Sequence, residues 1–333
     1  MQPPVEPGTE SNPAVDYWKE VFPILSTIFD NFISSDPIVE RVCSCWRSML
    51  ISYRTAMTPL LAPLVNKLVS GFQQTRNGCF LWPTGAVLRE FSAHRDDVNS
   101  ALTDSVYEFF EAQAVTFLRA LSETAPRDFA MAIKGFFRLA ADALTYYPNK
   151  FVPSHLLKPI FEAASYSLVL EQKEPVQETL NFLRDLLKCG SDNPASSPNF
   201  APEQPAQFRT IILQLVTTHG EPLMKQIITG LVFWFHSDCY SPATGVIVEM
   251  LQILPEQTMV WLKGSLELLE TLSPAEMTQL LKKVHDHVEQ GGHQSMRQIR
   301  STIDSFAYNY RRRHVAPRDG LEQVAEASFQ YTD

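Results

Sequence analysis

Regularly spaced prolines constrain the fold of this 333-residue chain more than any other feature of its sequence. Several of them follow a polar residue and open a segment with helical periodicity: Asn12-Pro13, Asp36-Pro37, Thr58-Pro59, Glu174-Pro175, Glu221-Pro222, Ser241-Pro242 and Ser273-Pro274. Proline fits the first turn of a helix, where its missing N–H costs no hydrogen bond, but it ends a helix that precedes it. The pattern therefore predicts a series of separate helices.

The hydrophobic periodicity of helices recurs along the chain, and no segment shows strand alternation flanked by hairpin turns. The expected helices span 14–33, 36–54, 58–76, 80–91, 97–122, 126–147, 153–170, 175–189, 204–218, 221–236, 242–253, 256–271, 274–290 and 294–312. Their starts are about 20 residues apart, so a helix pair recurs every 40–47 residues or so, the period of HEAT-type arrays. We predict an all-α fold, a right-handed α-solenoid of about seven antiparallel helix pairs. A compact helical bundle is the alternative, but it would not require such even punctuation.

The remaining segments lack this periodicity. We expect residues 1–13 to be a disordered lead-in, 14–313 to form the solenoid and 314–333 to be a frayed tail. Within the solenoid, the proline-, serine- and asparagine-rich stretch 189–207 has the composition of a mobile loop.

Charge and cysteine content restrict the class of protein. A formal net charge of −9 argues against a general nucleic-acid binder. Five cysteines without CxxC spacing, and no signal peptide, favour a reducing cytosolic or nuclear compartment without a disulfide framework. The longest apolar run, 227–235, is too short to span a bilayer.

Enzymatic and metal sites find little support in the sequence. It contains no glycine-rich phosphate loop, no GxSxG and no HExxH, so we predict a protein without catalysis or cofactor. His285, His287 and His293 lie close together in the sequence. On a helix, however, His285 and His287 point about 200° apart and cannot chelate one ion, so we do not predict a metal site here.

The helix expected at 36–54 has two contrasting faces. One arc is apolar and contains Trp46, while the other carries arginine and serine, including Arg41, Ser44, Arg47 and Arg54. Arginine presents a rigid fork of donors that suits carboxylates and phosphates. These arginines are either a solvated helix face or a ligand-binding surface.

A second basic stripe is expected on the helix at 126–147. Arg127, Lys134 and Arg138 are spaced i, i+7, i+11 and so lie within about 40° of one another. Both helices are the second of their pair and should face the concave side, which predicts one groove between two basic stripes. The helix expected at 97–122 carries an acidic stripe of Asp97, Asp104, Glu108 and Glu111. This helix is the first of its pair, so we expect the stripe on the convex side, as a solvated surface.

Four segments resemble a known family in their order and spacing: IVERVCSCWRSML at 38–50, NGCFLWPTGAVLREF at 77–91, GFFRLAADAL at 135–144 and NFLRDLLKCG at 181–190. They are similar to the C-terminal third of transportin-SR, the mRNA transport regulator type of nuclear import receptor in the importin-β superfamily. The resemblance implies a HEAT superhelix that shuttles between cytoplasm and nucleus and binds Arg/Ser-rich splicing and mRNA-binding proteins. It also implies nucleoporin partners and release by the GTPase Ran, which is bound mainly by N-terminal repeats that have no counterpart here.

In the family, the helix that matches 36–54 carries a stripe of arginines that grips phosphorylated serines of the cargo. Arg41 and Arg47 match family arginines, whereas Ser44 stands where the family has arginine, as do Pro37 and Ile51. Arg54 is an additional arginine one turn further on. The thinner stripe favours a fungal-type receptor for an arginine-rich, RGG-type cargo that is less phosphorylated.

The expected cargo-binding residues are those of the two basic stripes: Arg41, Ser44, Arg47, Arg54, Arg127, Lys134 and Arg138. Two alternatives stay open. One is a cargo receptor of the importin-thirteen type, and the other is a HEAT scaffold that organises an enzyme complex, as phosphatase scaffold subunits do.

Overall fold

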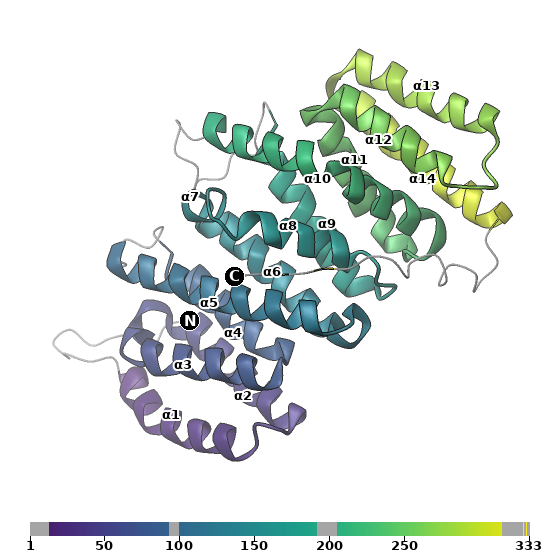
Figure 1. The fold of residues 1–333 in the computed structure, drawn as a ribbon. Coiled ribbons are helices and arrows are strands. Elements are labelled where there is room, and N and C mark those ends of the chain that lie inside the picture. Colours follow the sequence, from purple (N-terminus) through teal and green to yellow (C-terminus); the bar gives the residue numbers. More distant parts are fainter. Residues whose placement is uncertain (1–12, 93–99, 192–204, 315–328, 330, 332–333) are drawn as a thin grey trace.

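A computed structural model describes residues 13–92, 100–191, 205–314, 329 and 331 (Figure 1). The α-helices are α1 (Pro13–Asn31), α2 (Asp36–Tyr53), α3 (Thr58–Thr75), α4 (Leu81–Glu90), α5 (Ser100–Glu123), α6 (Ala130–Tyr146), α7 (Pro148–Phe151), α8 (Leu157–Ser167), α9 (Lys173–Lys188), α10 (Pro205–Phe233), α11 (Tyr240–Ile253), α12 (Pro255–Glu267), α13 (Pro274–Gln290) and α14 (Gly292–His314). Short 3₁₀ turns precede four of them: η1 (Arg54–Met57), η2 (Gly78–Phe80), η3 (Pro126–Phe129) and η4 (Ser237–Cys239). Within these described ranges, every helix is too short or too polar to cross a bilayer.

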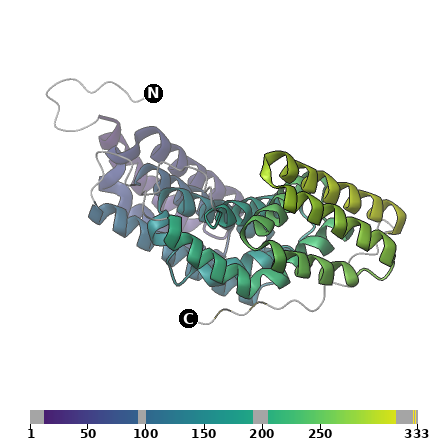
Figure 2. The ribbon, with the colours of Figure 1, turned by 90° about the horizontal axis from the view of Figure 1, so that it is seen from above.

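The helices stack in two rows that run the length of the molecule (Figures 1 and 2). In the second row, each helix packs on the next in the order α2, α4, α6, α9, α11, α14. The first row contains α1, α3, α5, α8, α10, α12 and α13. The predicted α-solenoid is confirmed, and the segments expected at 36–54 and 126–147 do belong to the second row.

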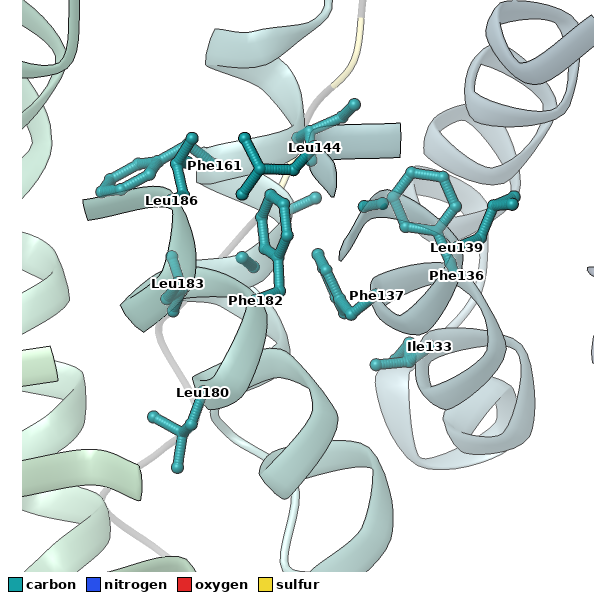
Figure 3. Close-up of a cluster of buried hydrophobic side chains, with 14 of the residues drawn as sticks. Ile133, Phe136, Phe137, Leu139, Leu144, Phe161, Leu180, Phe182, Leu183 and Leu186 are labelled. Carbon is teal, nitrogen blue, oxygen red and sulfur yellow. The ribbon is translucent and has the colours of Figure 1, made fainter. Parts of the chain in front are cut away.

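One continuous hydrophobic core joins the two rows. Phe136 and Phe137 of α6 show how: the Phe136 ring stacks on Phe117 of α5, with centroids 3.8 Å apart, and the Phe137 ring lies 5.6 Å from Phe182 of α9. Figure 3 shows Phe137 and Phe182 packed between the two helices, with Leu183 beside them. Each such side chain contributes roughly 1.5–3 kcal/mol when it is fully buried. The core therefore fixes the spacing of neighbouring second-row helices.

The structure differs from the sequence prediction at Pro222. The helices expected at 204–218 and 221–236 are one helix, α10, with Pro222 inside it. A proline in a helix interior costs about 3 kcal/mol, and close packing on α12 offsets this cost. A Cβ added to Gly220 would lie 2.4 Å from the Trp261 ring, so the glycine brings α10 directly against α12. Because α10 is a single helix, the second row contains six described helices instead of the seven that regular pairing would give.

The boundaries of the irregular segments also differ from the prediction. Pro13 begins α1, α10 starts at Pro205 within the expected loop, and His314 is the last residue of α14. Phe329, expected in a frayed tail, is 8% exposed and stacks on Tyr166 of α8 with ring centroids 5.8 Å apart. The predicted bounds are therefore wrong at these positions: Pro13, Pro205 and His314 belong to helices, and Phe329 packs against α8. The rest of the lead-in, loop and tail lies outside the described residues.

One supersecondary unit occurs twice. In both copies a 3₁₀ turn with a buried cysteine, Cys79 in η2 and Cys239 in η4, leads into a helix of the second row. A buried threonine then donates to the carbonyl oxygen four residues earlier: Thr84 to Phe80 at 2.8 Å, and Thr244 to Tyr240 at 3.0 Å. A glycine follows each threonine. The fifth residue after the threonine is Arg89 in α4 but Glu249 in α11. The two copies thus share a backbone framework and differ in charge.

Candidate anion-binding pocket

A cavity of about 360 Å³ opens on the second row between α2, α4 and α6. Its lining residues are Ser44, Arg47, Ser48, Leu81, Trp82, Gly85, Arg89, Met131, Lys134, Gly135, Arg138, Leu139 and Asp142. We call this cavity the basic pocket. It brings together four side chains from the two predicted stripes: Ser44, Arg47, Lys134 and Arg138.

Two charged residues of the basic pocket were missed by the sequence reasoning. Arg89 of α4 donates from Nη1 to Oδ2 of Asp142 on α6, at 2.5 Å. The pair is 53 residues apart in the chain, so only the packing of α4 on α6 reveals it. A signal was available in part, since Asp142 follows Arg138 by four residues and therefore shares its helix face.

The arginines lie close enough to affect one another. The pKa of Arg47 is lowered first by burial and then by the positive charges of Arg89 and Arg138, while Asp142 opposes the change. Like charges held together in a partly buried site favour an anionic ligand, which relieves their repulsion. The basic pocket therefore combines three guanidinium groups with one carboxylate.

Asp142 carries the most perturbed carboxyl group of the basic pocket. Burial raises its pKa from 3.8 to about 6, although Arg89 and Arg138 act in the opposite direction. Glu178 on the neighbouring α9 adds to the increase. Desolvation is the largest of these effects. The resulting pKa lies about one unit below pH 7, so the carboxyl group is mostly ionised at that pH.

Lys134 lines the basic pocket but already has a partner. Its Nζ forms an ion pair with Oε2 of Glu174 on α9. The lysine side chain is 28% exposed and the glutamate 63%. An exposed pair of this kind is weak, yet it neutralises the lysine, so the pocket's excess positive charge rests on the three arginines.

Three of the predicted residues do not line the basic pocket. Arg41 is exposed on α2, one turn before Ser44. Arg54 follows the end of α2 with φ at 50°, and its Nε lies 3.5 Å from a carboxylate oxygen of Glu90. Arg127 is exposed in the 3₁₀ turn η3 and not on α6, so the predicted i, i+7, i+11 alignment is wrong for this residue. That alignment assumed an α-helix from residue 126, whereas α6 begins at Ala130.

Other candidate sites gain nothing from the structure. Asp104 of the acidic stripe pairs with Lys150, while Asp97 lies outside the described residues. His285 pairs with Glu289 one turn later on α13. Across the described part of the chain, His, Cys, Asp and Glu side chains form no group of three or more that could hold a metal ion.

Comparison with known proteins gives consistent matches. A sequence model of the transportin-3/importin-13 fourth TPR domain matches residues 12–118. An uncharacterised protein of Schizosaccharomyces pombe is 28% identical over 324 residues, which cover 96% of this chain and 33% of that protein. The mRNA transport regulator MTR10 of Saccharomyces cerevisiae is 27% identical over 295 residues, covering 84% of this chain and 30% of the relative.

Solved structures give a similar result. A structure described as importin-13 in its cytosolic state superposes with a TM-score of 0.70 at 13% sequence identity, over 92% of this chain and 33% of that one. The likeness supports the helical solenoid. The chain spans about a third of the length of the proteins that it matches.

Proposed function

We propose that this chain is a karyopherin-type segment of the importin-β superfamily and that it binds protein cargo for import into the nucleus. The observation that carries this proposal is the convergence of Arg47, Arg89 and Arg138 on one cavity. Three guanidinium groups around a space of about 360 Å³ suit a tetrahedral or planar oxyanion of a cargo side chain.

The cargo class that fits best is a segment in which arginine and phosphorylated serine alternate. A phosphoryl group carries about two negative charges at neutral pH and three acceptor oxygens, which matches the arginines of the basic pocket. Glu178 on the adjacent α9 carries the opposite charge and suits the arginines of such a segment. Arg89 adds a third guanidinium group to the pocket beside the thinned stripe on α2, while Asp142 offsets one of the three positive charges.

A repetitive cargo compensates for weak single contacts. One exposed ion pair contributes only about 0.2–1 kcal/mol, and repeated engagement by neighbouring residues of the same ligand raises the effective concentration at the pocket. We further propose that the full-length receptor shuttles between cytoplasm and nucleus, contacts nucleoporins and releases its cargo when Ran binds. These proposals derive from the resemblance to import receptors.

The test is binding of an Arg-Ser repeat peptide, phosphorylated or not, by fluorescence anisotropy. We expect the phosphorylated peptide to bind and the double variant Arg47→Glu/Arg138→Glu to lose it. Arg54→Glu/Arg127→Glu is the matched control, because it reverses two charges outside the pocket. If both double variants lose the same amount of peptide affinity, the effect comes from net charge alone. If Arg47→Glu/Arg138→Glu keeps its full peptide affinity, the proposal is refuted and a scaffold is favoured.

A further inference from the structure

We infer that Asp142 is the resident counter-anion of the basic pocket, and that an anionic ligand binds there together with a proton taken up by this carboxyl group. The inference deepens the proposed function, on which it rests for the identity of the natural ligand. The proton linkage itself belongs to the pocket and can be measured with a simple oxyanion.

The geometry places Asp142 in direct competition with a ligand. Its carboxylate lies 2.5 Å from Arg89 and is 18% exposed at the cavity wall, and it is the single acidic side chain among the described lining residues. A Cβ at Gly85 would come within 2.8 Å of Oδ2, so the glycine of α4 makes room for this carboxylate. An incoming oxyanion therefore meets arginines that already hold one negative charge.

The charged groups around Asp142 come from every neighbouring second-row helix. Arg47 faces it from α2, Arg89 from α4, Arg138 from its own helix and Glu178 from α9. In the free protein this balance leaves the pKa of Asp142 at about 6, so the group is mostly ionised at pH 7.

A bound oxyanion shifts this balance in one direction. A second negative charge in the same cavity disfavours the ionised carboxyl group and raises the pKa of Asp142 further. Once that pKa passes the ambient pH, the protein takes up a proton as the ligand binds. The neutral carboxyl group can then donate a hydrogen bond to the ligand instead of repelling it.

The consequence is that Asp142 weakens anion binding at high pH. Above pH 7 the ligand has to bind and protonate Asp142 together, so affinity should fall by up to tenfold for each pH unit. Asparagine lacks the negative charge at all pH values. Asp142→Asn should therefore bind an oxyanion up to about hundredfold more tightly at pH 8, with the advantage disappearing below pH 6.

Sulfate is the appropriate probe, because its charge does not change between pH 6 and 8. We would titrate it by calorimetry into the chain at several pH values, in buffers of different ionisation enthalpy. We expect wild type to take up roughly one proton near pH 7 and Asp142→Asn to take up none. Asp185→Asn on α9 is the control, since this acid does not line the pocket, and it should behave like wild type.

Each outcome decides the inference. It is overturned by absence of sulfate binding, by equal proton uptake in wild type and Asp142→Asn, or by weaker binding in that variant at pH 8. If Asp142→Asn does not fold, the sulfate affinity of wild type is measured against pH. An affinity that does not change with pH overturns the inference. Sulfate binding with proton uptake, together with failure to bind the phosphopeptide, would refute the proposed function and leave the inference standing.

Discussion

Two ion pairs occupy equivalent places in the repeated unit of the second row, with their charges exchanged. Arg89 of α4 pairs with Asp142 of the next second-row helix, α6. Glu249 of α11 lies 4.0 Å from Arg300 of its next second-row helix, α14. The first pair borders the basic pocket, whereas Glu249 is only 5% exposed.

The neighbours of each pair explain the difference. Around Glu249 stand the cations Arg184, Lys188 and Arg300, with Asp185 as a second acid, and Asp304 lies near Arg300. The charges of this cluster balance, so it holds α9, α11 and α14 together without an excess for a ligand. Around Asp142 three arginines, Arg47, Arg89 and Arg138, stand against two acids, Asp142 itself and Glu178. Excess charge, and not the presence of arginine, distinguishes the proposed binding site from the balanced cluster.

The largest effect is expected from charge reversal in the basic pocket. Arg47→Glu/Arg138→Glu should weaken binding of an Arg-Ser phosphopeptide at least hundredfold, because each reversal replaces an attraction in a partly buried site by a repulsion. Arg184→Glu, in the balanced cluster, should change the affinity less than twofold. Both affinities can be measured by calorimetry at constant ionic strength, and similar losses in the two proteins would erase the distinction.

A second prediction concerns stability against pH. Burial raises the folded-state pKa of Asp142 from 3.8 to about 6, so the folded protein binds more protons than the unfolded chain in this window. The free energy of unfolding of wild type, relative to Asp142→Asn, should be highest near pH 4 and fall by about 2–3 kcal/mol by pH 7.5. Urea denaturation at each pH measures the difference. Glu249→Gln should show the same sign, since burial also raises the pKa of Glu249, and a constant difference for both would contradict the account.

A third prediction separates the two pairs by function. Arg300→Met removes one of the cations beside buried Glu249 and should cost about 1–2 kcal/mol of stability, while phosphopeptide affinity stays within twofold. Arg89→Met should weaken phosphopeptide binding several-fold. Denaturation and binding are measured on both variants. Weaker binding in Arg300→Met would show that the balanced cluster also contributes to the site.

The smallest effect is expected at Lys134. Because Glu174 already neutralises it, Lys134→Gln should lower phosphopeptide affinity by no more than about twofold. Glu174→Gln frees the lysine and should raise the affinity by a similar factor. Anisotropy at low salt resolves such changes. A tenfold loss in Lys134→Gln would move Lys134 into the group of principal contacts.

The sequence allowed the fold to be predicted because each helix is specified locally. Prolines and hydrophobic periodicity fall within single helices, so α2, α9 and α13 begin and end close to the expected positions. Pro222 was misjudged because the continuity of α10 depends on packing between Gly220 and Trp261 of another helix. Such a contact has no signature within the segment itself.

The site was predictable to the extent that it follows a helix face. Arg47, Lys134 and Arg138 were found from spacing on α2 and α6, and all three line the basic pocket. Arg89 and Asp142 were missed because their pairing depends on how α4 and α6 align. The neutralisation of Lys134 by Glu174 was likewise invisible, since the partners are 40 residues apart.

The stacking of Phe329 on Tyr166 has a mechanical consequence. A solenoid in which each repeat contacts only its neighbours stretches like a spring whose coils are connected in series. The aromatic contact is different, because it joins Phe329 directly to α8, without passing through the helices between α8 and Phe329 in the sequence. A force applied between α8 and Phe329 therefore acts on this contact before it reaches the helices from α9 to α14.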